Sequence, residues 1–281
     1  MVLESISLFF SILTEELFLR PEFLTGFFTL LILYIIFFIR ASSTQEQDDS
    51  TVDILWGVNA VTYSAIFFVF SSPIYINFVL FFVLSLWGYR LIFAVFDKRK
   101  KLNGKEDPRY TSLKKSFPKK FYNIQRFLKI YLLQLLLGTL MLLPVMIFMQ
   151  FTQYYSEFQN LVFQFGIFVL GAGLFIETLA DLQMRAFKKQ KTKEKSFCEE
   201  GLWAYSRHPN YFGESLFWLG IAIVLSTQTT FGFISWLLIT YLLLFVSGIP
   251  RAEEGFIGNK EYEEYQKSVS SFIPWFRKEK E

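Results

Sequence analysis

Seven long apolar stretches dominate the sequence and decide what kind of protein it can form. They run approximately over residues 22–40, 52–70, 73–96, 127–149, 159–181, 211–227 and 230–249. A helix needs about 20 mostly apolar residues to cross the hydrocarbon core of a bilayer. Of the 281 residues, 53% are hydrophobic, which is too apolar for a soluble domain. The sequence therefore predicts an all-α polytopic membrane protein with about seven transmembrane helices.

The first 20 residues differ from these stretches. Residues 3–19 are apolar, but Glu4, Glu15 and Glu16 interrupt the run. We therefore expect residues 1–20 to form an interfacial or partly inserted helix. The beginning of the chain has no basic region and no small-residue cleavage site, so we do not expect a cleavable signal peptide.

The remaining residues, 21–281, are predicted to form one membrane domain, because they contain no internal repeat and no Pro/Gly-rich linker. Near its end, the segment from Lys260 to Val269 places Tyr262, Tyr265 and Val269 on one helical face. This spacing predicts a short amphipathic C-terminal helix.

Basic residues are divided unevenly between the two sides that seven spans would define. One side receives Arg40, twelve residues from Lys98 to Lys129, seven from Arg185 to Arg207 and six from Arg251 onward. The other side receives only Arg20. Because basic loops are retained in the cytoplasm, we expect these loops to be cytoplasmic and the amino terminus to lie outside.

Composition argues against several functions. One histidine and one cysteine supply no ordinary ligand set for a zinc or haem centre, so we expect no metal site. The basic loops accompany no recognised nucleic-acid-binding fold, so we expect them to attract anionic lipid headgroups instead. The expected partners are membrane lipids and a lipophilic small molecule, with no nucleic acid and no obligate protein partner.

Four charged side chains recur along the fifth stretch at the spacing of one helical face. Glu177, Asp181 and Arg185 follow one another four residues apart, and Lys188 extends the stripe. They could form a self-satisfied ladder of ion pairs. However, Glu177 lies more than two turns inside the span, where a carboxylate is costly without a polar cavity. We therefore predict that the carboxylates bind ribose hydroxyls or an adenine amine, and that the basic side chains hold phosphates.

A second polar cluster precedes the sixth stretch and contains the single histidine. It comprises Arg207, His208, Pro209, Asn210, Tyr211 and Glu214. Pro209 ends any preceding helix and Asn210 is a good N-cap, so both have a structural explanation. Glu214 would be favoured by the helix dipole. Arg207 and His208 need no such role, and Arg207 with the helix amino end could hold a phosphate.

A third cluster, Arg251-Ala-Glu-Glu254, follows the seventh stretch. Charges at such a position ordinarily just end a span, and this is the role expected of Glu253. All three clusters lie near the predicted cytoplasmic face. We therefore predict that they converge on one cytosolic ligand.

Several motifs carry a family resemblance. They are Gly201-Leu-Trp-x-Tyr-Ser-Arg-His-Pro-Asn-Tyr-Phe-Gly-Glu214, Glu177-x3-Asp181-x-Gln183, Ser271-Phe-x-Pro274, Val52-Asp53-x2-Trp56-Gly57 and Glu106-Asp-Pro-Arg-Tyr110. Together, from about residue 51 to residue 276, they resemble the steroid 5-alpha-reductase superfamily, and most of all its bacterial branch of uncharacterised membrane proteins.

The resemblance implies a bundle that binds NADPH from the cytosol and delivers hydride to an activated carbon–carbon double bond. The substrate would be lipophilic, steroid- or isoprenoid-like, and would enter from the bilayer, which would be a bacterial inner membrane. By the resemblance, cofactor ligands match Asp181, Arg185 or Lys188, Asn210, Glu214 and, in the tail, Glu254. The cofactor-binding half would then cover about residues 159–281.

The substrate end resembles the family less closely. Steroid reductases use a Glu on the second span and a Tyr on the third to polarise the 3-oxo group, and here the candidates are Asp53 and Tyr89. Hydride attack on an enone builds negative charge on its oxygen, which a positioned donor must stabilise. Tyr89 would donate, and Asp53 would orient it or share its proton.

Two rival functions stay open. An S-adenosylmethionine-dependent methyltransferase of the isoprenylcysteine or phospholipid type shares the Arg-His-Pro-x-Tyr motif. It would bind its cofactor through Arg207, His208, Tyr211 and the segment from Arg251 to Glu254. A non-catalytic lipid binder would retain the bundle without turnover. Asn210, Glu214 and the Glu177/Asp181 face favour the reductase.

Overall fold

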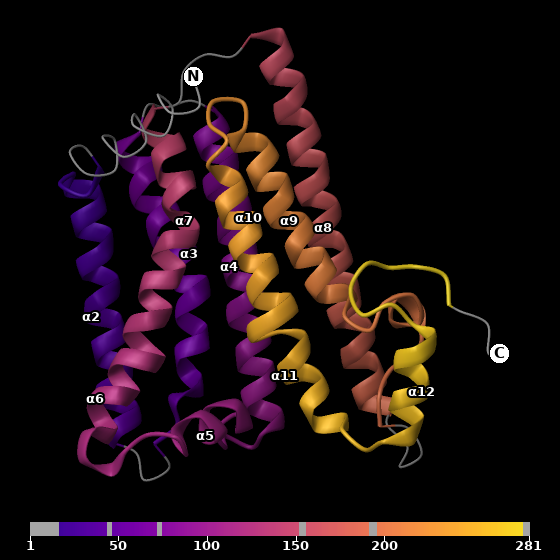
Figure 1. The fold of residues 1–281 in the computed structure, drawn as a ribbon. Helices are drawn as coiled ribbons and strands as arrows, with labels where there is room; N and C mark the ends of the chain where they lie inside the picture. The colour runs from indigo at the N-terminus through magenta and orange to yellow at the C-terminus, as the bar shows by residue number, and fades with distance from the viewer. Residues whose placement is uncertain (1–16, 44–46, 72–74, 152–155, 191–195, 278–281) are drawn as a thin grey trace. The chain divides into compact units, whose positions relative to one another are not determined.

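The computed structural model describes residues 17–43, 47–71, 75–151, 156–190 and 196–277, and these form helices and connecting loops (Figure 1). Within these ranges no β-strand occurs, and the β-type pairing is an isolated bridge between Ser206 and Ser270. The chain divides into two compact units, Met1–Gln153 and Tyr154–Glu281.

The first unit holds the first four predicted spans. Its helices are α2 (Pro21–Ser43), α3 (Ile54–Phe70), α4 (Tyr75–Lys101), α5 (Pro108–Lys114), α6 (Tyr122–Arg126) and α7 (Leu133–Phe151), with 3-10 helices at Asp49–Asp53 and Lys119–Phe121 and a π-helical turn at Phe127–Leu132. Close backbone packing joins α3 to α4, because a Cβ on Gly57 would lie 2.4 Å from the carbonyl oxygen of Gly88.

The second unit holds the remaining spans and the C-terminal helix. Its helices are α8 (Glu157–Gln190), α9 (Pro209–Leu225), α10 (Gly232–Tyr241), α11 (Ile249–Glu253) and α12 (Lys260–Ser268), with 3-10 helices at Gly201–Ala204 and Glu254–Phe256 and a π-helical turn at Leu242–Val246. In Figure 1, α9 runs beside both α8 and α10.

In the part of the chain that the structure describes, six helical segments are long and apolar enough to cross a membrane. They are Pro21–Ser43, Asp49–Phe70, Tyr75–Lys100, Lys119–Gln150, Glu157–Lys189 and Gly232–Phe256. The predicted all-α polytopic class is thus confirmed. The stretch predicted over residues 211–227 forms α9, which has 17 residues and falls short of the roughly 20 that a span usually needs.

The structure tests the prediction for the C-terminal end of the chain but only a small part of the prediction for the N-terminal end. Of the helix expected over residues 1–20, residues 1–16 lie outside the described part of the chain, and residues 17–20 form a turn before α2. The amphipathic C-terminal helix is confirmed as α12, which Asn259 caps by accepting a hydrogen bond from the Tyr262 backbone N–H at 3.2 Å. Its expected apolar face, Tyr262, Tyr265 and Val269, is buried in a cluster with Phe197 and Phe256.

Candidate functional site

Helices α8 and α9 approach so closely that only glycine fits at their contact. A Cβ on Gly213 would lie 2.5 Å from the backbone nitrogen of Glu177, and a Cβ on Gly173 would lie 2.3 Å from that of Phe217. The Glu177 side chain is buried. Because Asn210 precedes Gly213 by one turn and Glu214 follows it directly, the contact sets Glu177 against the first turns of α9. The structure thus brings together the helical segments that carry three of the predicted cofactor residues.

The N-cap expected at Asn210 is incorrect. Helix α9 begins at Pro209, whose missing N–H costs nothing in the first turn, so the cap position falls to His208. Asn210 is then the second helical residue. Its side-chain oxygen, Oδ1, is buried and has no hydrogen-bond partner among the described residues. Since buried polar atoms are nearly always hydrogen-bonded, this oxygen is an acceptor available to a ligand N–H.

The carboxyl-terminal end of α8 carries the rest of the predicted stripe. Helical geometry is continuous through Glu157–Gln190, so Asp181 and Arg185 share a face, half-buried, while Lys188 is exposed. The 3-10 helix Gly201–Ala204 is fastened beside this stretch. The Leu202 N–H donates to Oε1 of Gln183 at 2.9 Å, and the Trp203 indole N–H donates to the Ala180 carbonyl at 3.1 Å.

Arg207 and His208 converge on Glu253 of α11. Glu253 Oε1 accepts from Nε of Arg207 at 2.8 Å and lies 2.9 Å from Nε2 of His208. Two residues of α12 also donate to this carboxylate, Tyr262 through its hydroxyl at 3.2 Å and Gln266 through its amide at 2.7 Å. Arg207 and His208 therefore have internal partners, and Glu253 does more than end a span.

The segment before α9 is also held by the C-terminal tail. The Arg207 N–H donates to the Ser270 carbonyl at 2.8 Å, and Oγ of Ser206 donates to the Phe272 carbonyl at 2.7 Å. The His208 ring stacks on Tyr211, with ring centroids 5.3 Å apart. The start of α9 is thereby fixed by contacts from segments about 60 residues away in the sequence.

Two further predicted ligands lie at the surface. Arg251 and Glu254 are both exposed and pair with each other at 3.2 Å, three residues apart on one helical turn. Exposed pairs of this kind contribute at most about 1 kcal/mol. Neither residue is among the hydrogen-bond partners of Glu253, which among the described residues are Arg207, His208, Tyr262 and Gln266.

The tyrosines of α12 are held in the neutral form. Burial raises the pKa of Tyr262, and the negative charge of Glu253 raises it further. Burial also raises the pKa of Tyr265, whose hydroxyl donates to the Trp203 carbonyl. Both phenols therefore serve as hydrogen-bond donors at neutral pH, and they connect α12 to the segment before α9.

In the first unit, the structure places Tyr110, not Tyr89, against Asp53. Tyr110 donates its hydroxyl to Asp53, and Arg109 donates to the same carboxylate at 2.7 Å. The Tyr110 oxygen in turn accepts from Gln134 at 3.0 Å. Tyr89 is 53% exposed on α4. Asp53 is thus held by two residues of α5, and the expected pairing with Tyr89 is not what the structure displays.

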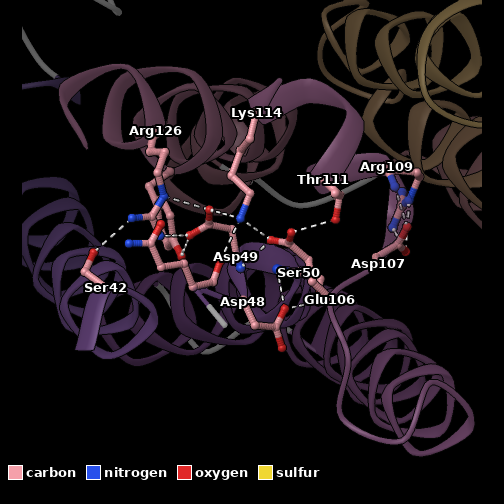
Figure 2. Close-up of polar contacts among 12 residues, drawn as sticks. Ser42, Asp48, Asp49, Ser50, Glu106, Asp107, Arg109, Thr111, Lys114 and Arg126 are labelled. Atoms are coloured by element: carbon pink, nitrogen blue, oxygen red, sulfur yellow. Dashed lines mark hydrogen bonds and ion pairs between the residues drawn. The ribbon is translucent and has the colours of Figure 1, made fainter. Parts of the chain in front are cut away.

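A buried ion pair lies at the centre of a larger polar network in this unit (Figure 2). Arg126 donates to both oxygens of Asp49, at 2.9 and 2.6 Å, and both side chains are fully buried. Lys114 contacts Asp49 at 3.3 Å and Glu106 at 2.6 Å, and Tyr131 donates to Asp49 at 2.8 Å. The network joins the segment before α3 to α5, α6 and the π-helical turn.

Asp107 begins α5 and anchors its first turn. It accepts from the Arg109 backbone N–H at 3.0 Å and from the Arg109 side chain at 2.9 Å, and it pairs with Lys98. Burial by itself would raise the pKa of Asp107, but the hydrogen bonds and charges of Arg109 and Lys98 lower it to about 2. Asp107 is therefore ionised throughout the physiological range.

No local sequence pattern indicated that Asp49, Glu106 and Arg126 interact, or that Glu253 binds Arg207 and His208. Asp49, Glu106, Arg126 and Glu253 lie in or beside polar connections, where charges are ordinarily solvated. The signal available was the Glu106-Asp-Pro-Arg-Tyr110 run, noted only as a marker of resemblance. In the described residues, no group of three or more His, Cys, Asp or Glu side chains is placed to hold a metal ion.

Fold and site together define an all-α, multi-pass membrane protein with polar side chains clustered within each of its two units. The chain belongs to the family described as "Protein of unknown function (DUF1295)", whose model matches residues 37–269. It is similar to an uncharacterised protein of Schizosaccharomyces pombe, with 24% identity over 260 residues that cover 83% of this chain and 74% of that protein. No solved structure matches the chain.

Proposed function

We propose that this protein is an NADPH-dependent membrane reductase that acts on an activated carbon–carbon double bond of a lipophilic, steroid- or isoprenoid-like substrate. The observation that carries the proposal is the buried, unsatisfied Oδ1 of Asn210 in the first turn of α9, beside the close α8–α9 contact at Glu177. The motif resemblance to the steroid 5-alpha-reductase superfamily supplies the reaction class.

The residues of the second unit fit a phosphorylated dinucleotide. Asn210 Oδ1 would accept from a carboxamide or adenine N–H, and Asp181 would accept from ribose hydroxyls. Arg185 and Lys188, toward the end of α8, would hold phosphates, because guanidinium and ammonium groups are the usual phosphate donors. When bound, the cofactor supplies the hydride, and the protein supplies orientation and exclusion of water.

In this proposal Arg207 and His208 support the cofactor site and do not bind the cofactor directly, although their sequence positions had suggested direct binding. Their contacts with Glu253 make them part of the wall that supports the start of α9, with Tyr211 stacked on His208. Glu214 and Asn210 remain the α9 side chains proposed to bind the cofactor. Arg251 and Glu254 are exposed and contribute least.

At the substrate end, Tyr89 is the proposed proton donor. Asp53 is engaged by Arg109 and Tyr110, so the proposal assigns it to anchoring α5 against the start of α3 rather than to orienting Tyr89. We further propose that the protein resides in a bacterial inner membrane with its cofactor site and basic loops on the cytoplasmic side.

Equilibrium binding of the purified protein to NADPH and to S-adenosylmethionine tests the proposal. We expect saturable NADPH binding and no binding of the methyl donor. Binding of S-adenosylmethionine without NADPH would establish the methyltransferase alternative instead. Lipid retention with no redox change, after reconstitution with NADPH and mixed lipids, would favour a non-catalytic lipid binder.

A further inference from the structure

The Glu253 carboxylate receives more donors than any ordinary helix-terminal charge would. Oε1 is shared by Nε of Arg207, Nε2 of His208 and the Tyr262 hydroxyl, while Oε2 accepts from Gln266. These donors come from the segment before α9 and from α12, whereas Glu253 itself ends α11. One side chain therefore connects three separate elements of the second unit.

This arrangement fixes the tautomer of His208. A carboxylate only accepts hydrogen bonds, so the imidazole nitrogen that faces it must carry the proton. In the neutral ring, the proton then lies on Nε2, and Nδ1 is left as an acceptor. The orientation of the ring is fixed as well, because its face stacks on Tyr211 at 5.3 Å with an interplanar angle of 8°.

Arg207 is positioned by the same carboxylate. Beyond its bond to Glu253, its Nη1 donates to the carbonyls of Gln266 at 3.0 Å and Val269 at 2.8 Å. The guanidinium is therefore a structural link between the start of α9 and α12. Its Nε and Nη1 donors are thereby engaged with acceptors of the protein itself.

We propose that Glu253 is a positioning residue for the cofactor site. It holds His208 in the Nε2–H tautomer and holds Arg207 against α12, and it thereby orients the first turn of α9 that carries Asn210. The consequence for the cofactor rests on the proposed function, whereas the tautomer of His208 does not.

The tautomer can be measured directly because the chain contains one histidine. Nitrogen–proton correlation spectra of the full-length protein, labelled with ¹⁵N-histidine in detergent micelles or nanodiscs, distinguish a protonated Nε2 from a protonated Nδ1. We expect the neutral ring of the wild-type protein to be in the Nε2–H tautomer. A predominant Nδ1–H tautomer would overturn the proposal without any variant being made.

Glu253→Met tests the cause, since methionine matches the length of glutamate but lacks a strong acceptor. We expect the single tautomer to become a mixture and NADPH affinity to fall by about tenfold or more. The control is Glu263→Met on the exposed face of α12, which should change neither quantity. Tyr262→Phe removes one donor only and should leave the tautomer intact. If Glu253→Met does not fold, the tautomer of the wild-type protein still tests the proposal.

The outcomes separate the two proposals. If the tautomer shifts in Glu253→Met but wild-type protein binds no NADPH, the proposed function fails and the positioning role stands. If wild-type protein binds NADPH and Glu253→Met retains both the affinity and the tautomer, the positioning role fails and the proposed function stands.

Discussion

Asn210 and Asp181 are the two side chains on which the proposed cofactor site depends most. Asn210 is the second residue of α9, so it does not cap the helix, and its Oδ1 has no protein partner in the described structure. Its removal should therefore cost binding and not stability. This separation of roles follows from the start of α9 at Pro209, two residues earlier than an N-cap at Asn210 would require.

We predict that Asp181→Ala and Asn210→Ala each weaken NADPH affinity by about tenfold or more, equivalent to about 1.4 kcal/mol, because each removes an acceptor for a cofactor donor. The thermal unfolding midpoint should stay close to that of the wild type. Ser226→Ala, at the far end of α9, is the control, since its hydroxyl donates to the Ile223 carbonyl in its own helix. Wild-type affinity in both site variants would assign these residues a structural role.

Asp107 makes the stability of the first unit depend on pH. Its pKa is about 2 when folded, against an ordinary 3.8, because of Arg109 and Lys98. A lowered folded-state pKa stabilises the protein above the unfolded-state value, and the stabilisation is lost as the pH falls from about 4 to about 2.

We predict that the free energy of unfolding falls by about 2 kcal/mol over this interval through Asp107 alone, and that Asp107→Asn removes this part of the pH dependence. Chemical denaturation in detergent at a series of pH values measures it. Glu261→Gln, on the exposed face of α12, is the control and should leave the profile unchanged. An unaltered profile in Asp107→Asn would contradict the assigned pKa.

At the scale of elements, the α8–α9 pair depends on glycines spaced seven residues apart. Gly166 and Gly173 on α8 and Gly213 and Gly220 on α9 each approach the other helix too closely for a Cβ. Small residues at such positions let helix backbones meet within a membrane, where packing rather than the hydrophobic effect drives association. This contact determines how near Glu177 lies to the start of α9.

We predict that Gly173→Ala destabilises the protein by about 1 to 3 kcal/mol, because its Cβ would meet the α9 backbone at 2.3 Å. Gly171→Ala is the matched control two residues away on the same helix, with nothing within 4 Å of the added carbon. It should be neutral or stabilising by up to about 1 kcal/mol. Thermal unfolding in detergent compares them, and equal effects would show that the close contact is not required.

At the scale of the whole molecule, the side of the membrane on which the carboxyl terminus lies depends on whether α9 crosses the bilayer. At 1.5 Å per residue its 17 residues span about 26 Å, a little less than the hydrocarbon thickness of about 30 Å. Because α9 connects α8 to α10 and runs beside both, we expect it to cross with slight local thinning of the bilayer (Figure 1).

We predict seven crossings, with the amino terminus outside and the carboxyl terminus in the cytoplasm, because the basic loops favour the cytoplasmic side. A fluorescent protein fused after Glu281 should fluoresce, and alkaline phosphatase fused there should be inactive. A phosphatase fused at residue 104, between α4 and α5, should also be inactive. Phosphatase activity at the carboxyl terminus alone would indicate six crossings.

The membrane class, most of the spans and α12 could be predicted from the sequence, because hydrophobic length and helical periodicity are local properties. The cytoplasmic placement of the basic loops stays a prediction. The stripe Glu177, Asp181 and Arg185 needed only continuous helix to lie on one face, and α8 provides it.

Only the tertiary structure decided which polar side chains meet. The pairing of Asp49 with Arg126 spans 77 residues, and that of Arg207 with Glu253 spans 46. Each depends on how helices pack, and no local pattern encodes the partner. A carboxylate pairs with whichever donors the packed helices bring within about 3 Å. Asp53 therefore accepts a hydrogen bond from Tyr110 and not from Tyr89.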